Sequence, residues 1–449
     1  MSQPVSSSTS KWRYRYLVAA IVFFAYSIQY LDRVKTTVLV PLISQSLQLS
    51  YSDVGNAMFL LMIFYGPTQI LSGFLCDRFG PKKVLVFSLV TWSLFTIYMA
   101  YMQNVTEWYI RNALFGIFVG TEFVPSARLI ARWFPKRERA QAQGVLSWSW
   151  IITPAWAPIL TTFLASYFND WRPVFIWLGL FGLIPLVIVL LLIYDRPEQV
   201  RWLSDSEVKE SYADELESGI LKDAGIKREH LAQEAKKAQI PLRNILLNKS
   251  FIAVVLSYLA CQMTFWGIVT WSPSYLSEVF KFKLTAMGAW ASIYFAAGVI
   301  GAFLSSRISD KLFNGRRRPM IILSFLGTFP FILLLALARP GISHMGLMLI
   351  LAGAGFFANM IWGPILAWPA DVFSPEMYGR ALGFVTGVAY FGAAFAPLIM
   401  SRLIIKTTTG VSYTYAWTFI AICAIAGLIA ASIVKDRQDV VQGNVSMSN

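Results

Sequence analysis

Asp32, Arg33 and Lys35 place three ionisable side chains inside the first long apolar stretch of the chain. The apolar and uncharged residues around them run from Tyr16 to Leu47, so the charges fall near the middle of the stretch. On an insertion scale, each charge costs roughly 2.5–3.5 kcal/mol at the centre of a membrane helix. A helix carries that load only when its charged face looks into protein or water. We therefore expect function at this interruption.

The chemistry open to these residues is anion binding coupled to proton exchange. The guanidinium of Arg33 is a planar, permanently charged fork that matches a carboxylate or a sulfonate. A carboxyl group held away from water, such as that of Asp32, can exchange a proton. The alternative is that the two adjacent side chains point to faces about 100° apart, each satisfied by a neighbouring helix. Lys35 is expected to be structural or to extend toward the membrane surface.

A second charged cluster, Arg111, Glu122 and Arg128, lies in the apolar stretch 108–133. Glu122 falls near its midpoint and is the second candidate for a proton site. Arg111 lies eleven residues earlier, about three helical turns, so it shares a face with Glu122 and is a second candidate for the anion. Pro125 is expected to bend this helix. The alternative for Glu122 is a structural pair with Arg128 or with another span.

The elements that position these charges are membrane-spanning helices. The chain has 449 residues, of which 56% are hydrophobic and 14% charged, against about 25% charged in soluble domains. Apolar stretches long enough to cross about 30 Å of hydrocarbon recur along it. The sequence predicts twelve spans, at 14–45, 54–75, 84–103, 108–133, 142–168, 173–194, 250–278, 286–306, 319–338, 344–370, 379–405 and 412–434.

The net charge of +14 reflects topology rather than nucleic-acid binding. Basic residues gather in the connections 77–83, 136–139 and 316–318, whereas the opposite connections 44–53 and 103–107 hold no Lys or Arg. By the positive-inside rule, the basic side faces the cytoplasm. We expect both termini there, in a multi-pass protein of the cell (inner or plasma) membrane.

The two halves of the chain repeat each other, which indicates an internal duplication. Gly144 and Ala157-Pro158 recur as Gly383 and Ala396-Pro397, at an offset of 239 residues. A charged segment separates the halves. The sequence predicts four parts: a first six-helix half at 1–194, a cytoplasmic linker at 195–249, a second six-helix half at 250–435 and a cytoplasmic tail at 436–449.

The connection after the second span resembles the signature loop of the major facilitator superfamily, and the resemblance covers essentially the whole chain. The residues that carry it are Gly73, Asp77, Arg78, Gly80 and Lys82. It implies an all-α integral membrane fold of twelve helices in two six-helix halves. The loop itself is expected to latch one conformation of the two halves rather than to contact substrate.

Further motifs resemble the anion:cation symporter family, which transports organic anions such as sugar acids and phthalate-type acids. They are Tyr30–Val34, Arg132–Pro135 with Glu138–Ala140, Asp195–Pro197 and Trp271–Leu276. This resemblance implies that Arg33 meets the anionic group of the substrate and that Asp32 takes up a proton. The chain departs from the family in its fourth span. There the family's acid follows the arginine by seven residues, and Phe118 holds that position.

The second half is almost free of ionisable residues in its spans, and alignment of the repeats sets Phe265 opposite Arg33. A site with cationic groups from one half only favours a carboxylate or a sulfonate over an organophosphate. Gln262 and Asn359 are the polar candidates for substrate binding in this half. Tryptophans such as Trp266 and Trp362 could line a narrow cavity or stack on an aromatic acid, or could simply pack.

The sequence thus predicts a secondary transporter that takes up a small organic anion by proton symport and alternating access, acting as a monomer. Its expected partners are the anion, the proton and lipid. The alternatives are an anion exchanger or an efflux transporter on the same fold, and a membrane sensor that does not transport. No phosphate-binding glycine loop and no pair of nucleophile and base stands out, so we expect neither an enzyme nor a cofactor or metal.

Overall fold

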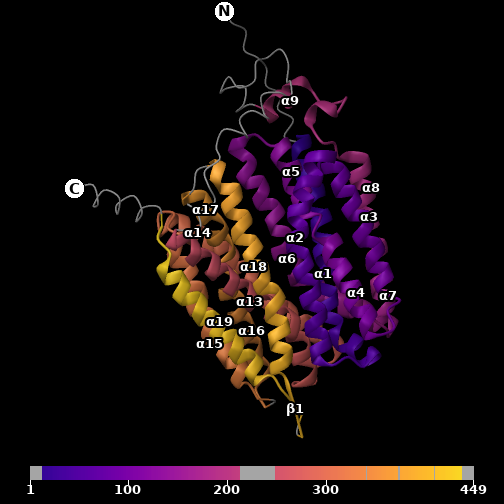
Figure 1. The fold of residues 1–449 in the computed structure, drawn as a ribbon, viewed down its shortest axis with the longest axis vertical. Helices are drawn as coiled ribbons and strands as arrows, with labels where there is room; N and C mark the ends of the chain where they lie inside the picture. The colour runs from indigo at the N-terminus through magenta and orange to yellow at the C-terminus, as the bar shows by residue number, and fades with distance from the viewer. Residues whose placement is uncertain (1–12, 213–247, 340, 373–374, 409, 437–449) are drawn as a thin grey trace, which may run out of the picture.

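The computed structural model describes residues 13–212, 248–339, 341–372, 375–408 and 410–436, and it is helical apart from one short hairpin (Figure 1). Most of the predicted linker and of the predicted tail lies outside these ranges. Twelve helical segments are long and apolar enough to cross a membrane. The predicted number of spans is therefore confirmed, with boundaries that differ by a few residues.

The first half consists of helices that pack side by side along the direction in which they would cross a membrane. Its elements are α1 (Tyr14–Leu47), α2 (Tyr51–Phe79), α3 (Pro81–Met99), α4 (Val105–Val119), α5 (Phe123–Trp133), α6 (Lys136–Phe168), α7 (Arg172–Phe181) and α8 (Leu183–Leu192). A 3-10 turn, η1 (Pro197–Gln199), and the short helix α9 (Asp205–Ser211) follow.

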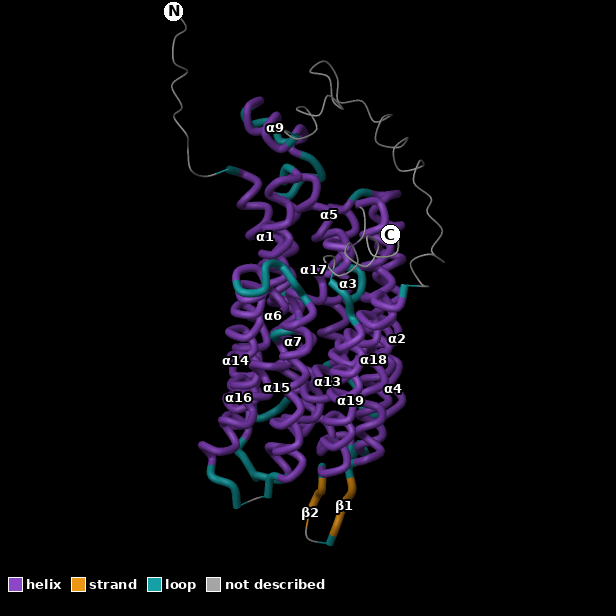
Figure 2. Tube along the Cα trace, turned by 90° about the vertical axis from the view of Figure 1, so that its left-hand side faces the viewer, coloured by secondary structure: helices purple, strands orange, loops and turns teal. Residues whose placement is uncertain are grey.

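The second half repeats this order and adds the hairpin. Its elements are α13 (Lys249–Glu278), α14 (Leu284–Lys311), α15 (Arg318–Leu337), α16 (His344–Asn359), α17 (Trp362–Val372), α18 (Pro375–Leu403), β1 (Ile405–Thr407), β2 (Gly410–Ser412) and α19 (Thr414–Ile433). Strands β1 and β2 are antiparallel. They extend from the end of the bundle opposite α9 (Figure 2). We call these two ends the hairpin end and the linker end.

Helix pairing confirms the internal repeat. In the first half α1 packs on α6, α2 on α4 and α3 on α7; in the second, α13 packs on α18, α14 on α16 and α15 on α19. These are equivalent spans in the two sequence repeats. The halves lie side by side, with the first in indigo to magenta and the second in orange to yellow (Figure 1).

The fourth and tenth spans are both interrupted, at equivalent places in the two repeats. Helix α4 ends at Val119 and α5 begins at Phe123, whereas α16 ends at Asn359 and α17 begins at Trp362. Pro125 has no N–H to donate to the carbonyl of Thr121, four residues earlier. The Ser72 hydroxyl of α2 donates to that carbonyl instead, at 2.7 Å. The predicted bend is thus a break whose free carbonyl is satisfied from a neighbouring helix.

The halves meet through α6 with α14, α2 with α18 and α1 with α13. Near the hairpin end the approach is close. A Cβ built at Gly55 would lie 2.3 Å from Ser401 Oγ, and one at Gly288 would lie 2.1 Å from Thr162 Oγ1. Toward the linker end, a Cβ built at Gly144 would meet no described atom within 4 Å. Among the described residues, the halves are therefore packed more tightly at the hairpin end.

Polar contacts reinforce this packing at the hairpin end. The Glu278 carboxylate accepts hydrogen bonds from Tyr51 of the first half at 2.7 Å and from Tyr413 of the second at 2.8 Å. Burial, with the Glu278 charge beside it, raises the pKa of Tyr413 well above its ordinary value, so its hydroxyl remains a donor. Arg402 also donates to Asn56 across the halves at 3.0 Å.

Candidate functional site

Arg33 lies on α1 between the two halves, with its side chain 3% exposed. Its guanidinium carbon lies 4.3 Å from the ring centre of Tyr65 in α2, 5.0 Å from that of Trp266 in α13 and 5.1 Å from that of Tyr30. Nη2 contacts the sulfur of Met62 at 3.8 Å, and Nε has no hydrogen-bond partner. Among the described residues, no carboxylate lies within ion-pair distance. The site therefore holds a buried cation without a counter-ion.

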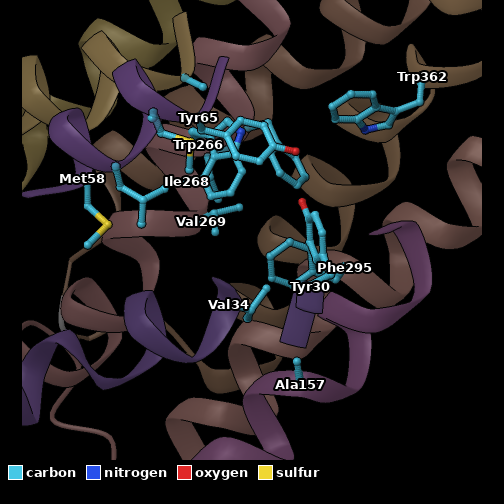
Figure 3. Packing of buried hydrophobic residues seen from close by; sticks show 14 of the residues in the cluster. Tyr30, Val34, Met58, Tyr65, Ala157, Trp266, Ile268, Val269, Phe295 and Trp362 are labelled. Carbon is cyan, nitrogen blue, oxygen red and sulfur yellow. The ribbon is translucent and has the colours of Figure 1, made fainter. Parts of the chain in front are cut away.

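The rings around Arg33 come from both halves, and Tyr65 and Trp266 appear together in the close-up of buried apolar side chains (Figure 3). The repeat alignment placed Phe265 opposite Arg33, but the ring that covers the guanidinium is its neighbour Trp266. Phe265 packs behind it, with ring centres 5.7 Å apart. Electron-rich ring faces offset part of the cost of the bare cation.

Asp32 turns to a different face of α1 from Arg33. Its carboxylate accepts hydrogen bonds from the Thr96 hydroxyl of α3 and from the Lys35 ammonium. Lys35 also donates to the Asp32 carbonyl at 3.2 Å and lies 4.4 Å from the ring centre of Phe175 and 5.4 Å from that of Phe115. The expectation that Lys35 could extend toward the membrane surface is wrong, because its side chain is fully buried. Asp32 thus has a counter-ion on its own helix and a hydroxyl donor on a neighbouring one.

Glu122 lies at the break between α4 and α5 and is fully buried. Neither carboxylate oxygen has a hydrogen-bond partner of normal geometry among the described residues, with the Trp92 indole as its polar neighbour. The alternative of a structural pair with Arg128 is wrong, since Arg128 is paired with Asp77 instead. Glu122 is therefore a buried carboxyl group without a cation, the converse of Arg33.

Gln29 is a site residue that sequence reasoning missed. It lies one turn before Arg33 on α1 and is fully buried. Its Nε2 donates to the carbonyl of Val119, the last residue of α4, at 3.1 Å, while its Oε1 has no partner. Gln29 thereby joins α1 to the break that carries Glu122. A polar amide one turn from the charged cluster, in an otherwise apolar stretch, was the signal that could have found it.

Arg111 is not brought together with Arg33. Its guanidinium donates to the Glu107 carboxylate at 2.7 Å and to the carbonyl of Tyr98, and its carbon lies 3.9 Å from the Tyr98 ring centre. These partners occupy the cation in this conformation. Its role in anion binding stays a prediction.

The two polar candidates of the second half, Gln262 and Asn359, differ in whether their amide atoms have hydrogen-bond partners. Gln262 lies one turn before Trp266 on α13, and its buried Oε1 has no partner. Asn359 ends α16 with both amide groups engaged. Its Nδ2 donates to Gly355 O at 2.8 Å, and its Oδ1 accepts from Trp362 Nε1 at 3.0 Å. Gln262 thus keeps one unpaired acceptor in this conformation, whereas both ends of the Asn359 amide are engaged.

Comparison with known proteins gives the family. A model of the major facilitator superfamily matches residues 22–316 and 282–445. The chain belongs to the major facilitator superfamily. Membership makes it a multi-pass membrane transporter rather than an enzyme, and the all-α fold of twelve helices is that of the superfamily.

Individual members of the superfamily resemble the whole chain. The probable sulfoacetate transporter of Cupriavidus necator is 26% identical over 404 residues, which cover 88% of each chain. The probable galactarate/D-glucarate transporter of Escherichia coli K12 is 25% identical over 430 residues, 92% of this chain and 93% of that one. The chain also superposes on the crystal structure of a bacterial homologue of the human lysosomal transporter Spinster, in an inward-facing and unoccupied conformation. The TM-score is 0.72, and the superposition covers 97% of both chains. At 16% sequence identity, this likeness supports the fold alone.

The signature loop of this superfamily member lies at the linker end and joins three spans. Asp77 at the end of α2 pairs with Arg128 of α5, and a Cβ built at Gly73 would lie 3.9 Å from that guanidinium. Gly80 turns the chain with φ of +87°, a conformation that favours glycine. The Arg78 guanidinium lies over the Phe79 ring, 5.3 Å from its centre.

Beyond that turn, the loop is tied to the chain that follows α8. The backbone N–H of Lys82 donates to Asp195 Oδ1 at 2.8 Å, and its ammonium donates to the carbonyl of Leu190 at 3.0 Å. A Cβ built at Gly80 would lie 2.8 Å from the Asp195 carboxylate. The contacts of the loop with other described residues are therefore to neighbouring helices at the linker end, and its predicted latch role stays a prediction.

The second repeat has its own version of this contact. Arg317, just before α15, donates to Asp310 of α14 at 2.6 Å and to Asp371 of α17 at 2.7 Å. Arginine–aspartate contacts thus join spans at the linker end of both halves, two spans through Arg128 and Asp77 in the first and three through Arg317, Asp310 and Asp371 in the second.

Proposed function

We propose that this superfamily member takes up a small organic anion by proton symport through alternating access. The observation that carries the proposal is Arg33, a buried guanidinium between the halves that has ring faces around it and no carboxylate among the described residues. A buried charge is normally paired, because isolation from water is costly. An anionic substrate would supply the missing partner each time it binds.

The class of anion follows from Arg33, the one cation that lies unpaired between the halves in the part of the chain that the structure describes. Lys35 is committed to Asp32, and Arg111 to Glu107. One guanidinium matches one carboxylate or sulfonate in bidentate geometry. The relatives named above, a probable sulfoacetate transporter and a probable galactarate/D-glucarate transporter, support an organic acid as substrate. Gln262 is the polar contact we propose from the second half, with Asn359 and Arg111 as further candidates once the helices move.

Glu122 is the proton carrier we propose. A buried carboxyl group without a cation is held most cheaply in its neutral form, so it gains by taking up a proton before it is closed off from water. Asp32 is the second candidate. Its pairing with Lys35 and Thr96 gives its charged form partners that Glu122 lacks.

Alternating access is supported by the unequal packing of the two ends. The contacts of Glu278 with Tyr51 and Tyr413, and of Arg402 with Asn56, join the halves at the hairpin end. By the positive-inside rule this end faces away from the cytoplasm, so the described conformation would be the inward-facing one. Substrate entry from outside would need these contacts to break while the linker end closes.

Transport in proteoliposomes of purified protein tests the proposal. An inward pH gradient, acidic outside, should drive accumulation of a labelled organic acid above its external concentration, and a protonophore should abolish it. Counterflow without a gradient should persist. An exchanger would show counterflow but no accumulation, and efflux would respond to the opposite gradient. Failure of both accumulation and counterflow, across carboxylates and sulfonates, would refute transport of organic anions.

A further inference from the structure

We propose that Gln29 couples the two sites of the first half, so that a proton on Glu122 strengthens anion binding at Arg33. This rests on the proposed function, which assigns the anion to Arg33 and the proton to Glu122. What it adds is the residue that joins the two sites. Gln29 is a positioning residue in this account, because it contacts a helix carbonyl rather than the substrate.

The break between α4 and α5 frees backbone carbonyls, and side chains from two other helices hold them. Ser72 of α2 donates to Thr121 O at 2.7 Å, and Nε2 of Gln29 on α1 donates to Val119 O at 3.1 Å. Buried carbonyls at a helix end need such partners, because leaving them unpaired is costly. Of these two contacts, the one made by Gln29 ties the break to the helix that carries Arg33.

A displacement of Gln29 is passed on to Arg33 because both belong to the same helix. They lie four residues apart, about one turn, so their side chains share a face of α1. Helix α1 is continuous from Tyr14 to Leu47. Both side chains are buried, Gln29 at 0% and Arg33 at 3% exposed. The amide is therefore a short link between the break and the guanidinium.

Glu122 is the group whose charge can change at this break. Helices α1, α2, α3 and α6 pack against α5. Helix α3 places the Trp92 indole beside the Glu122 carboxyl group. From α1 and α2 come Tyr26 and Tyr65, whose hydroxyls lie 3.4 Å apart, and from α6 comes the ring of Trp150. These neighbours are neutral near pH 7. The ion pairs of the same helices are already closed: Asp32 with Lys35, Asp77 with Arg128, and Arg15 with Glu138.

The second half has an equivalent break but lacks this set of polar residues. There Cys261, Phe265 and Ile361 occupy the aligned positions of the amide, the guanidinium and the carboxyl group. An interrupted span of this fold therefore does not itself require an amide from the first helix of its half. The three polar residues occur together in the half that holds the unpaired cation, as expected if they act as a unit.

The coupling begins with the charge on Glu122. When the carboxyl group holds a proton it is neutral, and the Gln29 amide stays on the Val119 carbonyl as described. When the proton leaves, the buried carboxylate is a stronger acceptor than a carbonyl, so it competes for N–H donors and shifts the break. Helix α1 then no longer holds Arg33 in its binding position. By linkage, the bound anion strengthens proton binding by the same factor.

The test measures anion affinity of purified full-length protein at pH 6 and pH 8, from the concentration dependence of thermal stabilisation. The probes are D-gluconate, benzoate and methanesulfonate, all ionised at both pH values. We expect the wild type to bind its best probe at least about fivefold more tightly at pH 6. Glu122→Gln mimics the neutral acid, so it should bind at both pH values as tightly as the wild type does at pH 6.

Two substitutions of Gln29 remove the link in different ways. Gln29→Met keeps the length of the side chain without its amide, and Gln29→Asn keeps an amide that is about 1.5 Å too short. Both should bind, at either pH, about as weakly as the wild type does at pH 8. The comparison between pH values is made within each protein, so a general loss of stability does not imitate a loss of coupling.

The matched control is Asn112→Leu. Asn112 is a fully buried amide on α4 whose Oδ1 is also unpaired, but its Nδ2 donates within its own helix, to Trp108 O at 2.8 Å. This variant should keep the pH dependence of the wild type. The same pH dependence in either Gln29 variant would overturn the inference and leave the proposed function standing. A wild type that binds none of the three anions, or binds them equally at both pH values, would instead contradict the proposed function.

Discussion

Replacing Asp32 and Lys35 singly and together is a sharp test of the charge arrangement in the first half. The change is Asp32→Asn, Lys35→Met and the double variant, all close in size to the native side chains. Each single variant leaves one buried charge without its partner, whereas the double variant removes both charges. The three proteins therefore differ in charge balance far more than in packing.

The expected size of the effect follows from the burial of the pair, since Asp32 is 1% exposed and Lys35 is 0% exposed. Removing one partner of a buried ion pair costs about 3–5 kcal/mol, whereas replacing both by uncharged groups of similar volume is often neutral. For a chain of this length, each single variant should therefore unfold roughly 3–5 °C below the wild type. The double variant should recover most of that loss.

The assay heats each detergent-purified protein and measures the monodisperse fraction by size-exclusion chromatography. The reasoning is refuted if both single variants are as stable as the wild type, or if the double variant is no more stable than the weaker single one. Transport by the double variant adds a second readout. If Glu122 carries the proton, accumulation driven by a pH gradient survives; if Asp32 carries it, counterflow survives and accumulation is lost.

Three further changes test the other assignments. Glu122→Gln should keep counterflow but lose pH-driven accumulation, and equal accumulation by variant and wild type would exclude Glu122 as the proton carrier. Asp77→Asn should lower the transport rate at least several-fold with little change in substrate affinity, because the contact of Asp77 with Arg128 lies at the linker end, away from Arg33. A large loss of affinity would instead implicate the loop in substrate binding. Glu278→Ala removes the acceptor shared by Tyr51 and Tyr413, which should loosen the contact between the halves at the hairpin end. A cysteine introduced at Ser401 should then react faster with a membrane-impermeant maleimide added on the hairpin side. An unchanged reaction rate would argue that these hydrogen bonds do not close this end.

The sequence was sufficient to predict the number and order of the spans, because every span must be long enough to cross the hydrocarbon and must keep most charges out of it. Twelve apolar stretches became twelve candidate spans, and the offset of 239 residues reappeared as equivalent helix pairings and equivalent breaks in α4/α5 and α16/α17. Pro125 marked the first of those breaks in advance. The sequence could not show that Ser72 would satisfy the freed carbonyl, because that contact depends on how α2 packs.

The site was harder to predict from the sequence, because the contacts of each charged side chain depend on how the helices pack. The Asp32 and Lys35 pair was within reach, because an acid and a base three residues apart face each other on a helix. The prediction placed Arg111 on the same helix face as Glu122, too far away for direct contact, and did not identify its ion-pair partner, Glu107, four residues before it. Trp266 rather than Phe265 covers Arg33. A repeat alignment matches positions along the backbone, but it does not give the rotation of each helix about its axis.

The measurement that tests the central claim most directly is anion binding by Arg33→Ala, compared with wild type and with Arg339→Ala, whose side chain is exposed. Binding to each purified protein is followed over a series of carboxylates and sulfonates. Hydrogen bonds to a charged group contribute about 1.5–3 kcal/mol, so loss of the guanidinium should weaken the best ligand by roughly 10- to 150-fold. The account predicts that Arg33→Ala loses this binding and that Arg339→Ala keeps it. Unchanged affinity in a folded Arg33→Ala protein would contradict the assignment of Arg33 as the anion-binding residue.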